Sequence, residues 1–162
     1  DINPNNAETA RNLAEAELVA ALWAAGRGRS PAAAFAATRR HAARALALDA
    51  DSAAAYLTLS KGARFEAEWR LARGEDPAAT VRPGLDACDR ALAIDAEQHE
   101  SRAIAGTLHL LLARAAADPG RRTELARQAA AELAAAFAAD ATLERPYAAS
   151  RAEADRLATQ SP

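Results

Sequence analysis

Three histidines and one cysteine are the residues of this chain best suited to metal binding or covalent catalysis. His99 and His109 are ten residues apart and His41 lies far from both, whereas two imidazoles that share a metal on one helix are typically four residues apart. Cys88 has no general base beside it in the sequence and lies on a helix face that must pack. We therefore expect a buried, inert thiol, no metal site, no cofactor and no enzymatic activity.

The glycines and the charged residues also lack an arrangement that would catalyse a reaction. The segment "GRG" at 26–28 has none of the later glycines, the lysine or the serine or threonine of a phosphate-binding loop, so we expect it to connect two helices. Acidic residues mostly stand opposite arginines along helix faces, as in Glu66 with Arg70 and Arg151 with Asp155. Such pairs solvate and support helices.

Charge, hydropathy and cysteine content exclude several classes of partner. The formal net charge is −2, from 20 basic and 22 acidic residues spread along the chain, so no basic stripe exists that would bind nucleic acid. No apolar run of about 18 residues is present, and we expect no membrane insertion by this segment. One cysteine rules out an internal disulfide and fits a reducing compartment. We expect a cytoplasmic location, with membrane anchoring of a longer parent protein left open.

The elements that position these residues recur along the chain. Turn residues fall at spacings of 46, 46 and 45, at Asn3, Asp49, Asp95 and Asp140. Further pairs 46 residues apart are Leu13 with Leu59, Trp23 with Trp69, Ser30-Pro31 with Asp76-Pro77, and Arg44-Ala45-Leu46 with Arg90-Ala91-Leu92. A period of this length is typical of a solenoid, in which each helical hairpin buries its apolar face against its neighbours. We expect the two tryptophans to fill the same gap between helices in their repeats, rather than to form a ligand cage.

Apolar periodicity and capping residues divide each repeat into two helices. In the second repeat, apolar residues at helical spacing run from Tyr56 to Leu71, Gly74 ends this helix, and Asp76-Pro77 starts the next one. The sequence therefore predicts one all-α domain over 1–162, with units at about 5–49, 51–95 and 97–140 and a charged capping helix at 143–158.

Two places depart from the regular pattern. Pro83-Gly84 lies inside a predicted helix, where we expect it to kink the helix or delay its regular part. In the third repeat, the turn Asp118-Pro119-Gly120 comes four positions earlier than the spacing predicts. The two helices of the third repeat are expected at about 97–117 and 121–139.

The end of each unit resembles the junction between tetratricopeptide repeats. The segment "ALALDADSAAAYLTLS" at 45–60 places Tyr56 where that family has a large aromatic residue, and "NPNNAE" at 3–8 is a typical junction of the family. The resemblance implies a right-handed α-solenoid of antiparallel helical hairpins, although each unit is about 12 residues longer than the family's repeat. The segments "ALWAAGRGRSP" and "EWRLARGEDP" also resemble the C-terminal tetratricopeptide regions of large bacterial serine/threonine protein kinases.

The resemblance further implies that the first helix of each unit lines an inner, concave wall. The residues that the packing pattern leaves free on this wall are Arg11, Glu15, Lys61, Arg64, Phe65, Thr107, Leu110 and Leu111. Such a wall would suit a short partner segment with an acidic residue and an apolar anchor. In an alternative interpretation, residues 110–112 are buried, because their arc is too wide to face one neighbour. The residue set of a chaperone-binding carboxylate clamp is absent apart from Arg11-Asn12 and Lys61.

These features favour an interaction protein over an enzyme. We expect a scaffold or regulatory module that binds a partner protein or peptide on the concave wall, as a fragment of a larger, kinase-containing protein; the first residues, "DINPNN", show neither an initiator methionine nor a signal peptide. The alternative is a structural segment that self-associates into homo-oligomers. In that case the apolar face around Leu13, Ala16 and Val19, which has no preceding helix in the sequence, would pair with another copy.

Overall fold

The computed structural model describes residues 6–160, and all regular structure in this part of the chain is helical. The α-helices are α1 (Ala7–Gly26), α2 (Ala32–Leu48), α3 (Ala53–Leu71), α4 (Ala78–Ile94), α5 (His99–Ala115), α6 (Pro119–Ala139) and α7 (Glu144–Ala158), with a short 3-10 helix η1 (Ala141–Leu143) before α7. The prediction of an all-α chain is therefore confirmed. No helix of the described residues is long and apolar enough to cross a membrane.

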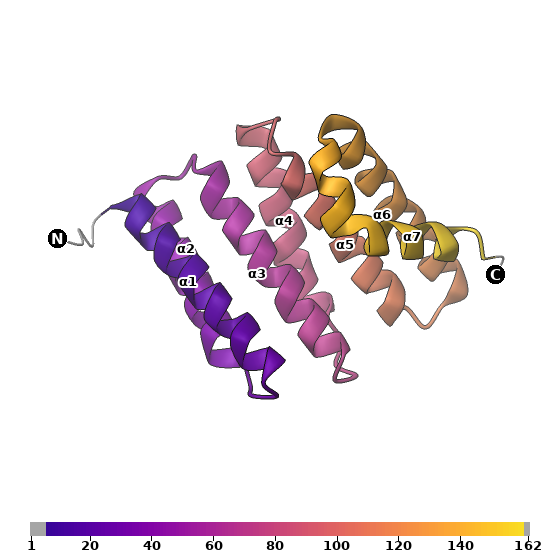
Figure 1. The fold of residues 1–162 in the computed structure, drawn as a ribbon, viewed down its shortest axis with the longest axis horizontal. Helices are drawn as coiled ribbons and strands as arrows, with labels where there is room; N and C mark the ends of the chain where they lie inside the picture. Colours follow the sequence, from indigo (N-terminus) through magenta and orange to yellow (C-terminus); the bar gives the residue numbers. More distant parts are fainter. Residues whose placement is uncertain (1–5, 161–162) are drawn as a thin grey trace.

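Helices that follow each other in the sequence pack in pairs. The pairs are hairpin 1 (α1 and α2), hairpin 2 (α3 and α4) and hairpin 3 (α5 and α6), and Figure 1 shows them side by side in chain order. The first helices of neighbouring hairpins also touch, because α3 contacts both α1 and α5. Helix α7 packs against α6 and α5, and Figure 1 shows it crossing hairpin 3.

The recurring aspartate ends the second helix of each hairpin in the same way. Asp49, Asp95 and Asp140 have nearly equal backbone angles, with φ of −148°, −136° and −143° and ψ of 95°, 101° and 101°. Each backbone N–H donates to the carbonyl four residues earlier, and each side-chain Oδ1 accepts from the amide two residues later. One local conformation therefore ends all three hairpins, as the spacing predicted; Asn3 lies outside the described residues.

The loops within hairpins 1 and 2 also share one conformation. Gly28 and Gly74, 46 residues apart, have φ of 71° and 76°, a region that glycine enters without strain. In both loops the backbone N–H of the residue after the glycine donates a hydrogen bond to the carbonyl five residues earlier, with N···O distances of 2.9 Å and 3.0 Å. The third loop differs, because Asp118 caps α6 by accepting from the N–H of Arg121, and Pro119 is the first helical residue. The expected turn at 118–120 is thus wrong in part: the helix already includes Pro119 and Gly120.

Helix α4 runs without interruption through Pro83. The expected delay of its regular part is not seen, since the helix begins at Ala78, and the proline removes only one backbone hydrogen bond near the start of the helix. The glycine that follows has a packing role. A Cβ on Gly84 would lie 2.7 Å from Ala63 Cβ and 3.0 Å from Leu108 Cδ1, so this position allows α4 to approach α3 and α5 closely.

The apolar core is distributed unevenly along the chain. Its largest part joins α5, α6 and α7 to the facing sides of α3 and α4, with Ile104, Leu108 and Leu133 fully buried. Hairpin 1 contributes two small clusters, one around Ala10 and Ala45 and one around Phe35. The helix α5 is buried on most sides, while α1 keeps much of its surface exposed.

Candidate interaction surfaces

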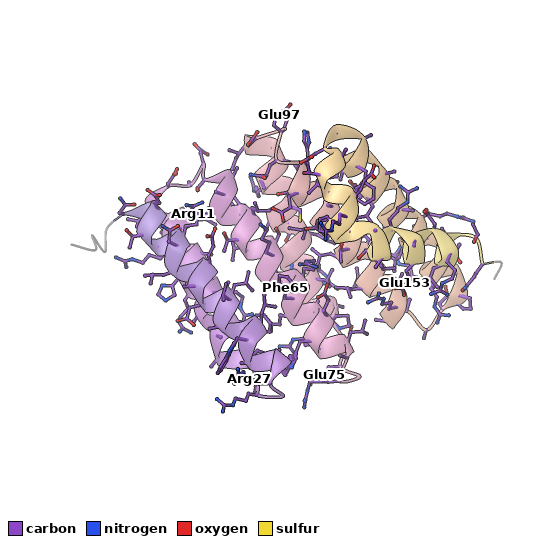
Figure 2. The ribbon with its side chains drawn as sticks, viewed as in Figure 1. Arg11, Arg27, Phe65, Glu75, Glu97 and Glu153 are labelled. Carbon is purple, nitrogen blue, oxygen red and sulfur yellow. The ribbon has the colours of Figure 1, made fainter. Side chains whose placement is uncertain are left out.

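The residues predicted for the wall on α1 and α3 are exposed or half-buried. We call the surface of Arg11, Glu15, Lys61, Arg64 and Phe65 the α1–α3 wall. Glu15 links the two helices, since its carboxylate accepts from Thr58 Oγ1 at 3.4 Å, and it lies 3.9 Å from the Arg11 guanidinium. Figure 2 shows Arg11 on α1 and Phe65 on α3 in one view of the molecule.

Both cations of α3 on this wall already have acidic partners. Lys61 Nζ lies 2.7 Å from Glu100 Oε2 on α5, and Arg64 Nη1 lies 3.2 Å from Glu68 Oε1. The Arg64 guanidinium also stacks 3.8 Å above the Phe65 ring, and its buried Nε has no hydrogen-bond partner. An incoming carboxylate would therefore exchange with these acids rather than meet a free positive charge.

The other three residues predicted for the wall are inside the molecule. Thr107, Leu110 and Leu111 are all buried, and Thr107 Oγ1 donates to the Ala103 carbonyl at 3.0 Å. The expectation that they line the wall is wrong, because α5 is packed between α3 and α4 on one side and α6 and α7 on the other. For Leu110 and Leu111, the alternative interpretation of burial is confirmed.

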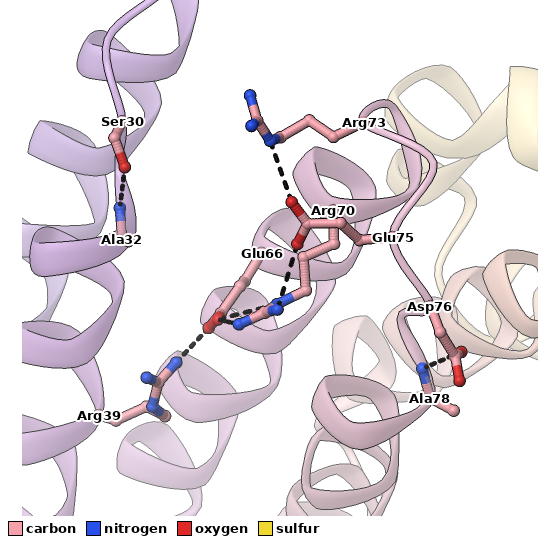
Figure 3. Close-up of polar contacts among 9 residues, drawn as sticks. All are labelled: Ser30, Ala32, Arg39, Glu66, Arg70, Arg73, Glu75, Asp76 and Ala78. Atoms are coloured by element: carbon pink, nitrogen blue, oxygen red, sulfur yellow. Dashed lines mark hydrogen bonds and ion pairs between the residues drawn. The ribbon is translucent and has the colours of Figure 1, made fainter.

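A buried carboxylate that the sequence did not reveal joins hairpins 1 and 2. Glu66 is only 4% exposed, and its two oxygens accept from Arg39 of α2 and, at 2.9 Å, from Arg70. Figure 3 shows this cluster, in which Arg70 and Arg73 also reach Glu75. The sequence predicted the pair of Glu66 with Arg70 as support for an exposed helix. It carried no signal for Arg39, which is 27 residues away.

The two equivalent tryptophans have different surroundings. Trp69 packs against the cluster of Leu18, Ala21 and Phe35 in hairpin 1, as expected for a residue that fills the gap between hairpins. Trp23 is 52% exposed, with the guanidinium of Arg27 4.2 Å above its ring, so the expectation of a shared role is wrong for this residue. No hairpin among residues 6–160 packs on the side of α1 that corresponds to the buried side of α3.

Exposed apolar side chains of α1 include Leu13, Val19, Leu22 and Trp23. Leu13, Val19 and Trp23 share one side of the helix, which we call the α1 outer face, whereas Leu22 lies on the side of Arg11 and Glu15. Val19 is 66% exposed, and Ala16 is exposed as well. The sequence prediction of an uncovered face around Leu13, Ala16 and Val19 agrees with these exposures.

A cleft of about 440 Å³ between α4, α5 and α6 was not predicted from the sequence. We call it the α4–α6 cleft, and its lining residues include Asp76, Arg82, Leu85, His109, Leu112, Ala115, Arg121, Leu125 and Gln128. The sequence signal that could have found it is the loss of the tryptophan repeat, because Ala115 stands 46 residues after Trp69.

The histidines and the cysteine do not converge on a catalytic arrangement. Cys88 is fully buried, and desolvation raises the pKa of its thiol to about 12, against a smaller opposing effect of a hydrogen bond with Ser60. Burial lowers the pKa of His109, whose buried Nδ1 has no hydrogen-bond partner. Among the described residues, no group of three or more His, Cys, Asp or Glu side chains could hold a metal ion.

Comparison of the chain with protein-family models, with curated proteins and with solved structures finds no match. The functional proposals below therefore rest on the chain's own sequence pattern and geometry.

Proposed function

We propose that this chain is a protein-interaction module, built as a right-handed α-solenoid of tetratricopeptide-like hairpins. The repeated aspartate caps support this fold, since they stand at the junctions where the sequence resembles that family, and the glycine loops of hairpins 1 and 2 recur with the same period of 46 residues. The proposal extends to a cytoplasmic, regulatory role in a larger bacterial kinase-containing protein, which the resemblance of "EWRLARGEDP" supports.

The partner is a protein segment that docks on the α1–α3 wall. The observation that carries this proposal is the side-by-side placement on α3 of two cations and an aromatic ring, with Arg64 stacked 3.8 Å above Phe65 and Lys61 one turn away. An acidic residue of the partner would replace Glu100 beside Lys61, and an apolar residue would contact the half-buried ring of Phe65. Because a carboxylate of the partner exchanges with one that the chain already has, the wall selects an acidic segment without carrying a large net charge itself.

Selection of peptides from a random library displayed on phage tests this proposal. The selected peptides should share an acidic residue near an apolar one, and the double substitution Lys61→Glu with Arg64→Glu should weaken their binding at least about tenfold. Calorimetric titration measures the affinities, and circular dichroism shows whether the variant is folded.

A matched control reverses two positive charges at positions outside the wall. Arg127→Glu with Arg145→Glu alters two exposed arginines outside the wall and should leave peptide affinity unchanged. Peptides that bind Lys61→Glu with Arg64→Glu as tightly as the parent chain, or the absence of any selected peptide, would contradict the proposal.

The α1 outer face favours a second function, self-association into homo-oligomers. Val19 and Trp23 occupy the same register on α1 as Phe65 and Trp69 on α3, and the latter two pack against hairpin 1. At the opposite end, where α7 packs on hairpin 3, the described residues expose no large apolar side chain. A symmetric pairing of two α1 outer faces would therefore use the same surface from both copies.

A further inference from the structure

The loops of hairpins 1 and 2 each form a small cavity, and the two cavities correspond residue by residue. The first is lined by Ala25, Gly28, Arg29, Ser30, Trp69 and Arg73. The second is lined by Leu71, Gly74, Glu75, Asp76 and Ala115. Each residue of the second follows a residue of the first by 46 positions. The side chain at position 115 therefore has the same place relative to the loop of hairpin 2 as Trp69 has relative to the loop of hairpin 1.

The α4–α6 cleft begins where the second cavity ends. Ala115 and Asp76 line both, and the cleft extends from them along α4 and α6 for a volume of about 440 Å³. At the junction of hairpins 1 and 2, the indole of Trp69 packs against Phe35 and its neighbours. At the junction of hairpins 2 and 3, a methyl group stands in that position, so the space that an aromatic ring would occupy is open.

The two junctions between hairpins differ in the residues around this space as well as in the tryptophan ring. Arg39 and Glu66, which form an ion pair between hairpins 1 and 2, correspond to Leu85 and Leu112, and both leucines line the cleft. With Leu125 they give the cleft an apolar floor. A flat apolar group would bury its area there favourably, whereas the equivalent place between hairpins 1 and 2 holds charges.

Polar groups at the cleft add a second requirement on the ligand. Arg82 and Arg121 bring two positive charges and Asp76 one negative charge, and Asp76 Oδ1 is already engaged with the Ala78 amide at 2.9 Å. Arg121 lies 2.7 Å from Glu124, and both side chains are more than half exposed. A carboxylate would therefore bind at Arg82 and would exchange with Glu124 at Arg121, and His109 with its unpartnered Nδ1 lines the same cleft.

We propose that the α4–α6 cleft binds an aromatic side chain of a partner polypeptide, with a neighbouring acidic residue held by Arg82 and Arg121. A polypeptide side chain is the occupant because the repeat places such a group, the tryptophan Trp69, at the equivalent position one unit earlier. This site is formed by α4, α5 and α6 and shares no residue with the α1–α3 wall, so it goes beyond the function proposed above.

Calorimetric titration of the full chain with Gly-Glu-Trp-Glu-Gly tests the proposal. The peptide should bind in a saturable way, Gly-Glu-Ala-Glu-Gly should not bind, and Gly-Lys-Trp-Lys-Gly should bind about tenfold more weakly. The substitution Ala115→Trp should fill the cleft and weaken the first peptide at least about tenfold. Lys61→Glu with Arg64→Glu should leave this binding unchanged, which separates the site from the α1–α3 wall.

A second variant covers the case in which Ala115→Trp does not fold. Arg82→Gln with Arg121→Gln alters only side chains at the exposed rim, and it should remove the preference for the glutamate peptide over the lysine peptide. Undetectable binding of the tryptophan peptide would overturn the proposal, as would full affinity in a folded Ala115→Trp variant. Tighter binding of free indole-3-acetate than of the peptide would overturn the assignment to a polypeptide side chain.

Discussion

At the scale of single residues, burial decides which of the reactive groups can react. Cys88 of α4 is buried in the core that joins α3 and α4 to hairpin 3, and the loss of hydration raises the pKa of its thiol to about 12 from an ordinary value of 9.0. The folded chain keeps the thiol neutral at pH 8, whereas the unfolded chain exposes a group that is about one tenth ionised. This difference contributes stability that is present below pH 9 and is lost as the pH rises from 9 toward 12.

Alkylation by iodoacetamide at pH 8 measures this effect. The folded chain should react at least about a hundredfold more slowly than the chain in denaturant, because both the ionised fraction and access to the sulfur fall on folding. Cys88→Ala, which removes the only thiol, provides the blank. Similar rates for the folded and the denatured chain would show that Cys88 is exposed in solution.

At the scale of helices, the close approach of neighbouring helices depends on glycine at two buried positions, Gly84 and Gly106. A Cβ on Gly106 would lie 2.8 Å from Leu133 Cγ and 3.0 Å from the Ala129 carbonyl oxygen, so α5 and α6 could not keep their spacing. Gly106→Ala should lower the free energy of unfolding by about 1 to 2 kcal/mol, since overpacking exceeds the gain in helix propensity.

Chemical denaturation measures this change, and the chain offers a matched control. Gly26 is also helical, but no atom lies within 4 Å of a Cβ built there, so Gly26→Ala should leave stability unchanged or raise it slightly. If Gly106→Ala proved as stable as Gly26→Ala, the close packing of α5 on α6 would not hold in solution.

Local features of the helices could be predicted from the sequence, and features that depend on packing could not. The aspartate caps and the ends of hairpin loops depend on neighbours in the sequence, so their spacing of 46 sufficed. The proline alone predicts a kink or a delayed start at Pro83-Gly84, whereas the need for glycine at position 84 comes from contacts with Ala63 and Leu108 on two other helices. Thr107 is buried for a similar reason, because periodicity shows the faces of a helix but not how many of them are covered.

At the scale of the whole molecule, the junctions between hairpins share a register but differ in chemistry. The first is held by a tryptophan and the buried Glu66 cluster, and the second by leucines around an open cleft. The sequence repeat predicted the position of each junction, and the resemblance to tetratricopeptide repeats suggested eight wall residues, of which the five of the α1–α3 wall are exposed or half-buried. The repeat did not predict the cleft, because the change from Trp69 to Ala115 shows which side chain is smaller but not whether neighbouring helices close over the space.

The two ends of the molecule differ as strongly, and the proposal of self-association rests on this difference. Helix α7 closes one end, where Arg114 of α5 donates to Glu153 at 2.9 Å and Tyr147 is buried. The other end exposes Val19 and Trp23 in the register at which α3 packs on hairpin 1. The equivalent residues of α3, Phe65 and Trp69, pack against hairpin 1. We therefore expect the exposed Val19 and Trp23 to form a similar apolar contact between two copies of the chain.

Sedimentation velocity over a range of concentrations tests this expectation. The parent chain should pass from monomer to dimer as concentration rises, and Val19→Glu with Trp23→Glu should remain a monomer, because the dimer would bury two unpaired carboxylates from each copy. Leu48→Glu with Ile94→Glu changes two exposed apolar residues at the ends of α2 and α4 and should dimerise like the parent chain. A parent chain that stays monomeric at millimolar concentration would remove the case for self-association and leave the α1–α3 wall and the α4–α6 cleft as the surfaces for partners.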